Sequence, residues 1–230
     1  MKHTLWIASL LTILTCLAIQ PAAADEVFFQ DHFEAADLQS GWSWLREDPQ
    51  GWGLSSGQLK IRTNGGYLWE ARNDQKNILL LDLPSEAEAE GFVAEITVDG
   101  RLLLDQAYEH GGLIWYLDDD HWVTLTQLNH VEHKTQKIML VHEVAGRGLA
   151  RQSKAVPYTS QRVNLRFAVA GRQFTGFYRE PGQTSWEKLG TLEFPEFEGT
   201  PRLGLVAGQG VAEKEHWVYF DDFRVRLGTP

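Results

Sequence analysis

Cysteine is almost absent from this chain of 230 residues. The single cysteine, Cys16, lies in an apolar run near the N-terminus, so a mature chain without that run has no disulfide and depends on its hydrophobic core for stability. No window of ten residues keeps an apolar period of 3.6, which excludes a fold of long amphipathic helices. Repeats of a fixed length are also absent, which disfavours a propeller.

Basic residues are in the minority. The chain has 21 Lys and Arg against 31 Asp and Glu, a formal net charge of −10. Nucleic acid and anionic membrane surfaces are therefore poor partners, because their phosphates repel an acidic chain, and neutral ligands fit better. A serine nucleophile elbow, a glycine-rich phosphate loop, a thiol nucleophile and the His spacing of a zinc enzyme are lacking too, so no self-sufficient catalytic motif is present.

The N-terminus has the pattern of a secretory signal peptide, which we assign to residues 1–24. Lys2 gives a positive start, residues 5–19 are mostly apolar but shorter than the roughly 20 residues of a membrane span, and residues 22–24 are alanines. We expect cleavage before Asp25 and a secreted or periplasmic mature protein without a membrane span. The alternative is an uncleaved N-terminal anchor.

Short alternating segments dominate the mature chain, residues 25–230, which we interpret as a single domain. In residues 92–98, 163–169 and 173–178 every second side chain faces one side of a predicted strand, and most of these side chains are apolar. Buried strands are expected at residues 67–69 and 78–83, and only a turn at residues 85–91. About a dozen short strands with glycine and proline turns predict an all-β sandwich or barrel.

One stretch, residues 111–128, predicts a β-hairpin. An apolar run leads into the acidic turn Asp118, Asp119 and Asp120, and an alternating run returns from it. Because the three carboxylates are consecutive in a turn, we expect their side chains to diverge. A solvated acidic turn, a calcium ligand set and a sugar contact all remain open for it.

Several stretches together resemble a known family. They are FFQDHF, GWSWLREDP, NILLLDLP, YEHGGLIWYLDDDHWVTL, IMLVHE, FTGFYREPGQTSW, RLGLVAG and WVYFDDFRV. The chain resembles, over nearly all of its mature length, the concanavalin A-like jelly-roll domains found at the C-terminus of β-xylosidases and in related stand-alone bacterial proteins. The resemblance implies two curved antiparallel sheets and, in general terms, carbohydrate binding. One departure is that members often carry a glutamate near the end of the strand after the acidic turn, where this chain has Gln127 and Leu128.

A sugar site needs flat aromatic faces together with groups that hydrogen-bond hydroxyls. Candidates of these types occur in an aromatic loop, around the hairpin and at strand ends: Trp44, Arg46, Glu47, Trp115, His121, Trp122, Glu143, Tyr178 and Arg179. We expect the loop and the hairpin to bring Trp44, Arg46, Glu47 and Trp122 to one groove. The alternative is that most of these tryptophans pack in the core, as large aromatics usually do in small sandwiches.

The favoured function is that of a secreted, non-catalytic carbohydrate-binding sandwich whose partner is an oligosaccharide or polysaccharide and which assists polysaccharide degradation. One rival is a glycoside hydrolase using Glu47, Glu143 or Asp120, since that chemistry needs two carboxylates across a glycosidic bond. The alternating acidic pattern of the glucanases of this broad fold, E-x-D-x-E, is absent. The other rival is a structural or interaction domain without sugar binding.

No cofactor is required by this function, but one acidic set could hold a structural ion. Asp31 lies near the start of the mature chain, and Asp221 and Asp222 lie in the last predicted strand. First and last strands of jelly rolls commonly lie side by side, and carboxylate oxygens suit calcium. Pairing of these aspartates with Arg224 or Arg226 is the alternative.

The signal-peptide assignment predicts that export removes residues 1–24. Intact-mass measurement of the exported protein should give the mass of a chain that begins at Asp25. An exported sample that still contains Met1 to Ala24 would show that the apolar run is an anchor instead.

Overall fold

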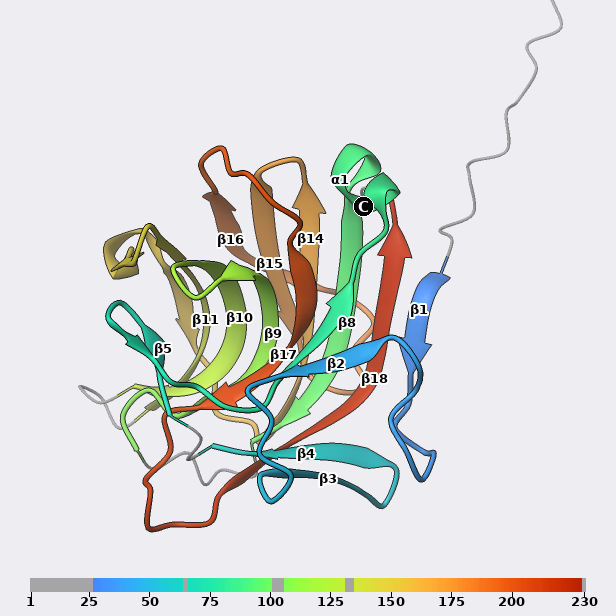
Figure 1. Cartoon of the computed structure of the whole chain (residues 1–230), viewed down its shortest axis with the longest axis vertical. Coiled ribbons are helices and arrows are strands. Elements are labelled where there is room, and N and C mark those ends of the chain that lie inside the picture. Colours follow the sequence, from blue (N-terminus) through green and yellow to red (C-terminus); the bar gives the residue numbers. More distant parts are fainter. Residues whose placement is uncertain (1–26, 64–65, 101–105, 131–134, 229–230) are drawn as a thin grey trace, which may run out of the picture.

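The computed structural model describes residues 27–63, 66–100, 106–130 and 135–228 of the chain (Figure 1). The predicted signal peptide lies outside the described residues. Among the described helices, none has the length and apolar character needed to cross a membrane.

Two antiparallel sheets form a sandwich, which confirms the predicted all-β fold. Sheet A has the strand order β16-β15-β14-β8-β18-β4-β3, with β1 paired to β18. Its strands are β1 (Val27–Asp31), β3 (Trp52–Ser55), β4 (Gln58–Arg62), β8 (Phe92–Asp99), β14 (Arg162–Ala170), β15 (Gln173–Arg179), β16 (Glu187–Glu193) and β18 (Trp217–Leu227).

Sheet B has the order β12-β11-β10-β9-β17-β7-β2, with β13 paired to β11. Figure 1 shows β9, β10 and β11 as strongly curved ribbons. The strands of this sheet are β2 (Trp42–Leu45), β7 (Ile78–Asp82), β9 (His110–Asp118), β10 (His121–His130), β11 (Thr135–Val144), β12 (Arg147–Gly148), β13 (Lys154–Pro157) and β17 (Arg202–Gly208). The pair β9 and β10, joined at Asp119 and Asp120, is the predicted hairpin.

Four short elements of the described chain lie outside the two sheets. The strands β5 (Leu68–Trp69) and β6 (Arg72–Asn73) form a separate hairpin, so residues 67–69 do not form the expected strand of the sandwich. Residues 85–91, expected as a turn, contain the helix α1 (Ser85–Glu90), and η1 (Ala150–Gln152) is a single 3-10 turn. The prediction for residues 67–69 was wrong because β5 has only two residues. The apolar pair Leu68–Trp69 is compatible both with a strand of the sandwich and with a short hairpin that packs on a sheet.

Alternate residues of both sheets fill the space between them. On β10, Val123 and Leu125 point into this core, and on β8 every second residue from Phe92 to Val98 does so. The period of two that predicted these strands thus also identifies which of their faces is buried.

Trp115 of β9 lies at the aromatic centre of the core. Its ring meets those of Phe174, Phe194 and Phe197 at centroid distances of 5.1, 5.0 and 5.1 Å, and the residue is 2% exposed. The proposal of Trp115 as a sugar-stacking residue is therefore corrected. Its position on β9 between Ile114 and Tyr116, which face outward, places it on the inner face.

The two ends of the described chain pair as expected, since β1 runs antiparallel to β18 with Asp31 opposite Phe223. Asp31 accepts hydrogen bonds from the Phe33 amide at 2.8 Å and from Trp42 Nε1 at 2.9 Å. Asp222 lies 2.7 Å from His32 Nδ1, and Asp221 accepts the Asp222 amide at 2.8 Å. Each carboxylate thus has a contact of its own, and the calcium site stays a prediction.

The core predicts a large cost for Phe174→Ala. Phe174 is 1% exposed and packs against Trp115, Phe167 and Phe194, so truncation should lower the free energy of unfolding by about 3–5 kcal/mol. Urea denaturation measures the change. Gln173→Ala, an exposed neighbour on β15, is the matched control and should stay within about 0.5 kcal/mol of the parent. Equal effects of the two variants would contradict the inner-face assignment.

Calcium at the chain ends predicts a response to chelation. An ion bound only by the folded state stabilises that state by mass action, so EDTA should lower the melting temperature and added Ca2+ should restore it. Asp221→Asn should abolish this response. Identical melting curves of metal-free protein with and without Ca2+ would leave the three aspartates with their protein contacts alone.

Candidate functional site

The outer face of sheet B, which points away from the sandwich core, is unusually apolar. On β10 this face carries Trp122, Thr124, Thr126 and Leu128, the residues between those that enter the core. Around them lies a second hydrophobic cluster, formed by Leu68, Ile78, Leu80, Ile114, Tyr116, Trp122, Val141 and Val206. Sheet B is therefore apolar on both sides.

The β5–β6 hairpin covers part of this outer face. Leu68 is 7% exposed within the second cluster, and the Trp69 ring lies 5.9 Å from the Trp122 ring. Trp69 also packs closely on Gly148 of β12, where a Cβ atom added to the glycine would come within 2.0 Å of the indole. Figure 1 shows the hairpin beside the curved strands β10 and β11.

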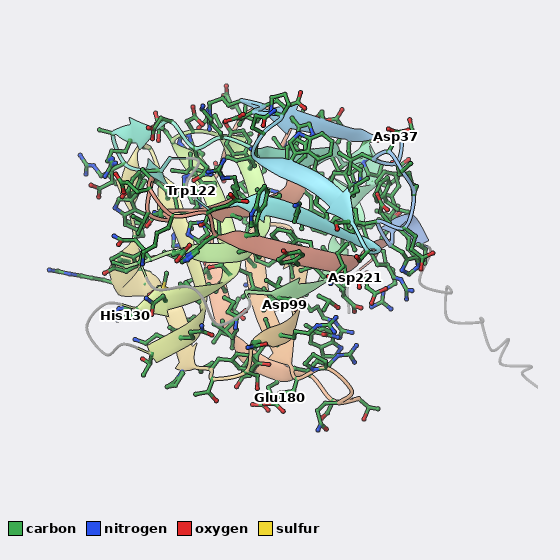
Figure 2. The ribbon with its side chains drawn as sticks, turned by 90° about the horizontal axis from the view of Figure 1, so that it is seen from below. Asp37, Asp99, Trp122, His130, Glu180 and Asp221 are labelled. Carbon is green, nitrogen blue, oxygen red and sulfur yellow. The ribbon has the colours of Figure 1, made fainter. Side chains whose placement is uncertain are left out.

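An open groove of about 420 Å³ remains beside the hairpin. Its lining combines aromatic rings, apolar side chains, hydroxyls, imidazoles and one guanidinium: Tyr67, Leu68, Trp69, Arg72, Tyr108, His110, Trp122, Thr124, Thr126, Leu128, His130, Met139, Val141, Ala150, Ser153, Val206 and Gln209. Figure 2 labels Trp122 and His130, which lie near the two ends of β10 and on the same side of the molecule, away from Asp221. The groove thus runs along β10.

The imidazole of His110 is held in one orientation at the groove. Its Nδ1 lies 2.8 Å from the Tyr108 carbonyl, so this nitrogen carries the proton and donates. Burial lowers the pKa of His110, although the Tyr108 carbonyl and the Glu109 charge oppose this. A neutral ring with Nε2 as a hydrogen-bond acceptor follows, which suits a ligand hydroxyl.

Tyr108 and Tyr67 offer aromatic surface at the groove in different ways. Tyr108 is 45% exposed and meets the His130 ring edge-on at 5.7 Å. The Tyr67 ring is covered by the guanidinium of Arg72, whose Cζ lies 3.3 Å from the ring centroid. Tyr108 is therefore the more open of the two for stacking.

Glu143 lies on the outer face at one end of the groove, directly opposite Trp122 in the β10–β11 register. It is fully buried, and its Oε2 accepts the Glu70 amide at 2.8 Å. Burial is the main cause that raises the pKa of Glu143, and the charges of Asp120 and Glu70 add to it. Glu143 is therefore a buried acid under the β5–β6 hairpin.

Arg46, which directly follows β2, connects this part of the chain to the β9–β10 turn. Its Nη1 donates to both oxygens of Asp119 at 2.9 Å, and its Nε donates to the Gln75 carbonyl at 2.6 Å. Tyr116 donates to the same Asp119 at 2.8 Å, and burial, followed by this aspartate, raises the pKa of the Tyr116 phenol. Arg46 therefore has a structural partner rather than an open guanidinium.

The other two turn carboxylates point to other partners, as expected for consecutive turn residues. Asp118 lies 2.8 Å from Nδ1 of His121, and Asp120 accepts the side-chain amide of Asn73 at 3.2 Å. Asp120 thus joins the β9–β10 turn to the β5–β6 hairpin.

The expected grouping of Trp44 and Glu47 with Trp122 is wrong. Trp44 packs against the inner core and meets the Trp52 ring at 4.9 Å, and Glu47 accepts Trp52 Nε1 at 3.0 Å. The reason is the alternation along β2, which turns Trp44 inward and Leu45 outward.

Two more predicted ligand residues lie on sheet A. Tyr178 donates to Glu187 at 2.7 Å, and the Arg179 guanidinium lies 4.2 Å from the Trp186 ring centroid. They are on the strand β15, whereas the groove is on the other sheet.

Most groove residues were missed at the level of sequence. The available signal was the alternation of β10: once Val123 and Leu125 are assigned to the core, the remaining Trp122, Thr124 and Thr126 define a second face. The contribution of the β5–β6 hairpin had no comparable signal.

The described residues were also considered as metal ligands. Throughout the part of the chain that the structure describes, no group of three or more His, Cys, Asp or Glu is arranged to hold an ion.

Comparison with known proteins gives one family and several similar structures. The Beta xylosidase C-terminal Concanavalin A-like domain family matches residues 30–226. No curated protein matches the chain.

The similar structures share the fold at low sequence identity. The GH43 BlXynB protein from Bacillus licheniformis has 17% identity and a TM-score of 0.72 over 86% of this chain and 39% of its own. The xylan beta-1,4-xylosidase from Bacillus halodurans has 18% identity and a TM-score of 0.67 over 92% of this chain and 41% of its own. A functionally unknown protein from Saccharomyces cerevisiae has 16% identity and a TM-score of 0.61, over 83% of this chain and 98% of its own.

The chain thus spans about two fifths of the length of these two bacterial proteins. At such identities the likeness establishes the fold, whereas the family match covers most of the sequence. The chain belongs to the family of β-xylosidase C-terminal concanavalin A-like domains.

Proposed function

We propose that the groove on sheet B binds a short stretch of a neutral glycan and that the protein acts as a non-catalytic binding module, accessory to polysaccharide degradation. The observation that carries this is the combination, in one groove, of aromatic surface from Tyr108 and Trp69 with hydroxyls from Thr124 and Thr126. Sugars present apolar C–H faces and many hydroxyls, and such a lining complements both. The predicted signal peptide fits a protein that meets polysaccharides outside the cell.

The charge of the groove supports a neutral ligand. Among the described residues that line it, there is no carboxylate, and Arg72, its one guanidinium, lies over Tyr67. The lowered pKa of His110 keeps that imidazole uncharged near neutral pH. Neither a strongly acidic nor a strongly basic ligand finds a matching field there.

The same lining favours binding over hydrolysis. Glycoside hydrolysis uses two carboxylates roughly 5–10 Å apart on either side of the scissile bond. Glu143 is fully buried under the β5–β6 hairpin, and Asp120 accepts a hydrogen bond from the Asn73 side chain. Glu47 lies beside Trp52 and outside the groove.

Binding to xylan-type oligosaccharides is the first test, because the similar structures include a xylan beta-1,4-xylosidase and a protein of a xyloglucan PUL. Calorimetry with xylohexaose, a xyloglucan heptasaccharide and cellohexaose should show binding of at least one of them. Tyr108→Ala should weaken it about tenfold, the loss of roughly 1.4 kcal/mol expected for one stacking surface.

Tyr219→Ala, on β18 of sheet A, is the matched control and should bind as the parent does. Equal binding by Tyr108→Ala and the parent would place the site elsewhere. Release of reducing ends during the titration would support the hydrolase instead, and a parent that binds no saccharide would leave a structural or interaction domain.

A further inference from the structure

Two buried polar atoms between the β5–β6 hairpin and sheet B have no hydrogen-bond partner in the described chain. Within the described residues, Glu143 Oε1 and Trp122 Nε1 are inaccessible to solvent and have no hydrogen-bond partner. Glu143 is 0% exposed and Trp122 is 3% exposed. An unmade hydrogen bond of a buried polar group costs about 1–3 kcal/mol, so the closed arrangement is not the most favourable one for these two side chains.

The two groups are close neighbours on one face. Trp122 and Glu143 are directly opposite each other in the antiparallel pair β10–β11, where side chains of one face have Cβ atoms about 4.5–5.5 Å apart. Trp122 also lines the groove, whereas Glu143 lies beyond it, covered by the hairpin. The indole N–H of Trp122 thus lies at the end of the groove, and the carboxyl group of Glu143 lies next to it under the hairpin.

The hairpin is held by few contacts. Its strands have two residues each, and a two-stranded hairpin is marginally stable alone. It is fixed to sheet B by two side-chain contacts, the Glu70 amide on Glu143 Oε2 and the Asn73 side-chain amide on Asp120, and by the packing of Leu68 and Trp69 on the outer face. The hairpin shares no strand pairing with sheet A or sheet B, so it can open without breaking the backbone hydrogen bonds of either sheet.

We propose that the β5–β6 hairpin is a flap over a second subsite, in which Trp122 Nε1 and the Glu143 carboxyl group hydrogen-bond the hydroxyls of a terminal, uncharged sugar ring. The identity of the ligand rests on the proposed glycan-binding function, and the flap itself does not. The indole N–H donates to a hydroxyl oxygen, and the carboxyl oxygen accepts a hydroxyl proton. A sugar acid is disfavoured, because the carboxylates of Glu70 and Asp120 lie close to Glu143.

The flap should respond to pH. Burial, with the nearby charges of Asp120 and Glu70, raises the pKa of Glu143 in the closed form, against the opposing His121 and Glu70 amide. When the pKa of an acid is higher in the closed form than in the open form, closure is most favourable at a pH below the ordinary pKa of the acid. Closure then becomes less favourable as the pH rises through the pKa of the closed form. Ionised Glu143 would then face Glu70 of the flap and Asp120 of the β9–β10 turn.

Amide hydrogen exchange without ligand tests the flap. After correction for intrinsic rates, protection of the Glu70 amide should fall at least tenfold between pH 4 and pH 8 in the parent. Glu143→Gln, which stays neutral and keeps an acceptor, should retain protection at both pH values. Gly148→Ala should lose it at both, because the new methyl group displaces Trp69. Glu193→Gln, an exposed change on β16, is the control and should follow the parent.

Calorimetry with the saccharides named above tests the subsite. Trp122→Phe removes a donor that has no partner in the closed protein, so it should weaken binding at least fivefold while secondary structure by circular dichroism is unchanged. Glu143→Leu should weaken binding at least tenfold, and Glu143→Gln less than threefold. Trp186→Phe, in the loop that precedes β16 and packs on Arg179 of sheet A, should have no effect.

The outcomes separate the two proposals. If the parent and Tyr108→Ala behave as expected but Trp122→Phe and Glu143→Leu bind as the parent does, the space under the hairpin holds only water and the subsite is wrong, while glycan binding stands. If Glu70 exchange is independent of pH and of Gly148→Ala, the hairpin is not a flap. If the parent binds no saccharide, the glycan function and the subsite both fail, and the exchange data still decide the flap.

Discussion

Sheet B is apolar on both faces, and this constraint organises much of the structure. One face closes the sandwich core through residues such as Val123 and Leu125, and the other carries Ile114, Tyr116 and Val141. A single layer of strands can bury only one face against sheet A, so the second face needs a cover. The β5–β6 hairpin provides one, but over only part of the face. The groove is the part of this second face that remains uncovered.

The fold could be predicted from the sequence because its main signal is local. A period of two along residues 92–98 and 163–169 identifies both the strand and its buried face, and sheet pairing then follows from the jelly-roll resemblance. The same locality explains the low identity to structures of equal architecture. Many apolar residues satisfy an inner position, so 17% identity is compatible with a TM-score of 0.72.

The site could be predicted only in part, because it depends on which side of a strand each aromatic residue faces. Trp44 and Trp122 have similar sequence surroundings, each with a charged residue two positions away and a turn close by. Their strands place them differently: β2 turns Trp44 toward the core, and β10 turns Trp122 outward. Glu143 was identified as a site residue, but its burial arises from the hairpin above it, a contact between segments 73 positions apart.

The acidic residues near the β9–β10 turn have partners within the protein, and none of them lines the groove. Asp119 is neutralised by Arg46, and Asp120 holds Asn73. Both contacts hold neighbouring segments on the β9–β10 turn, and neither aspartate lines the groove. Glu143, which does point to the outer face, is kept out of solvent by the hairpin, and burial favours its neutral form. The exposed groove therefore presents rings, hydroxyls and a neutral imidazole, although the chain as a whole is strongly acidic. Since such a surface gains little from long-range attraction, recognition must come from close fit at the groove, and the parts of the protein that set this fit are β10 and the hairpin that lies over its end.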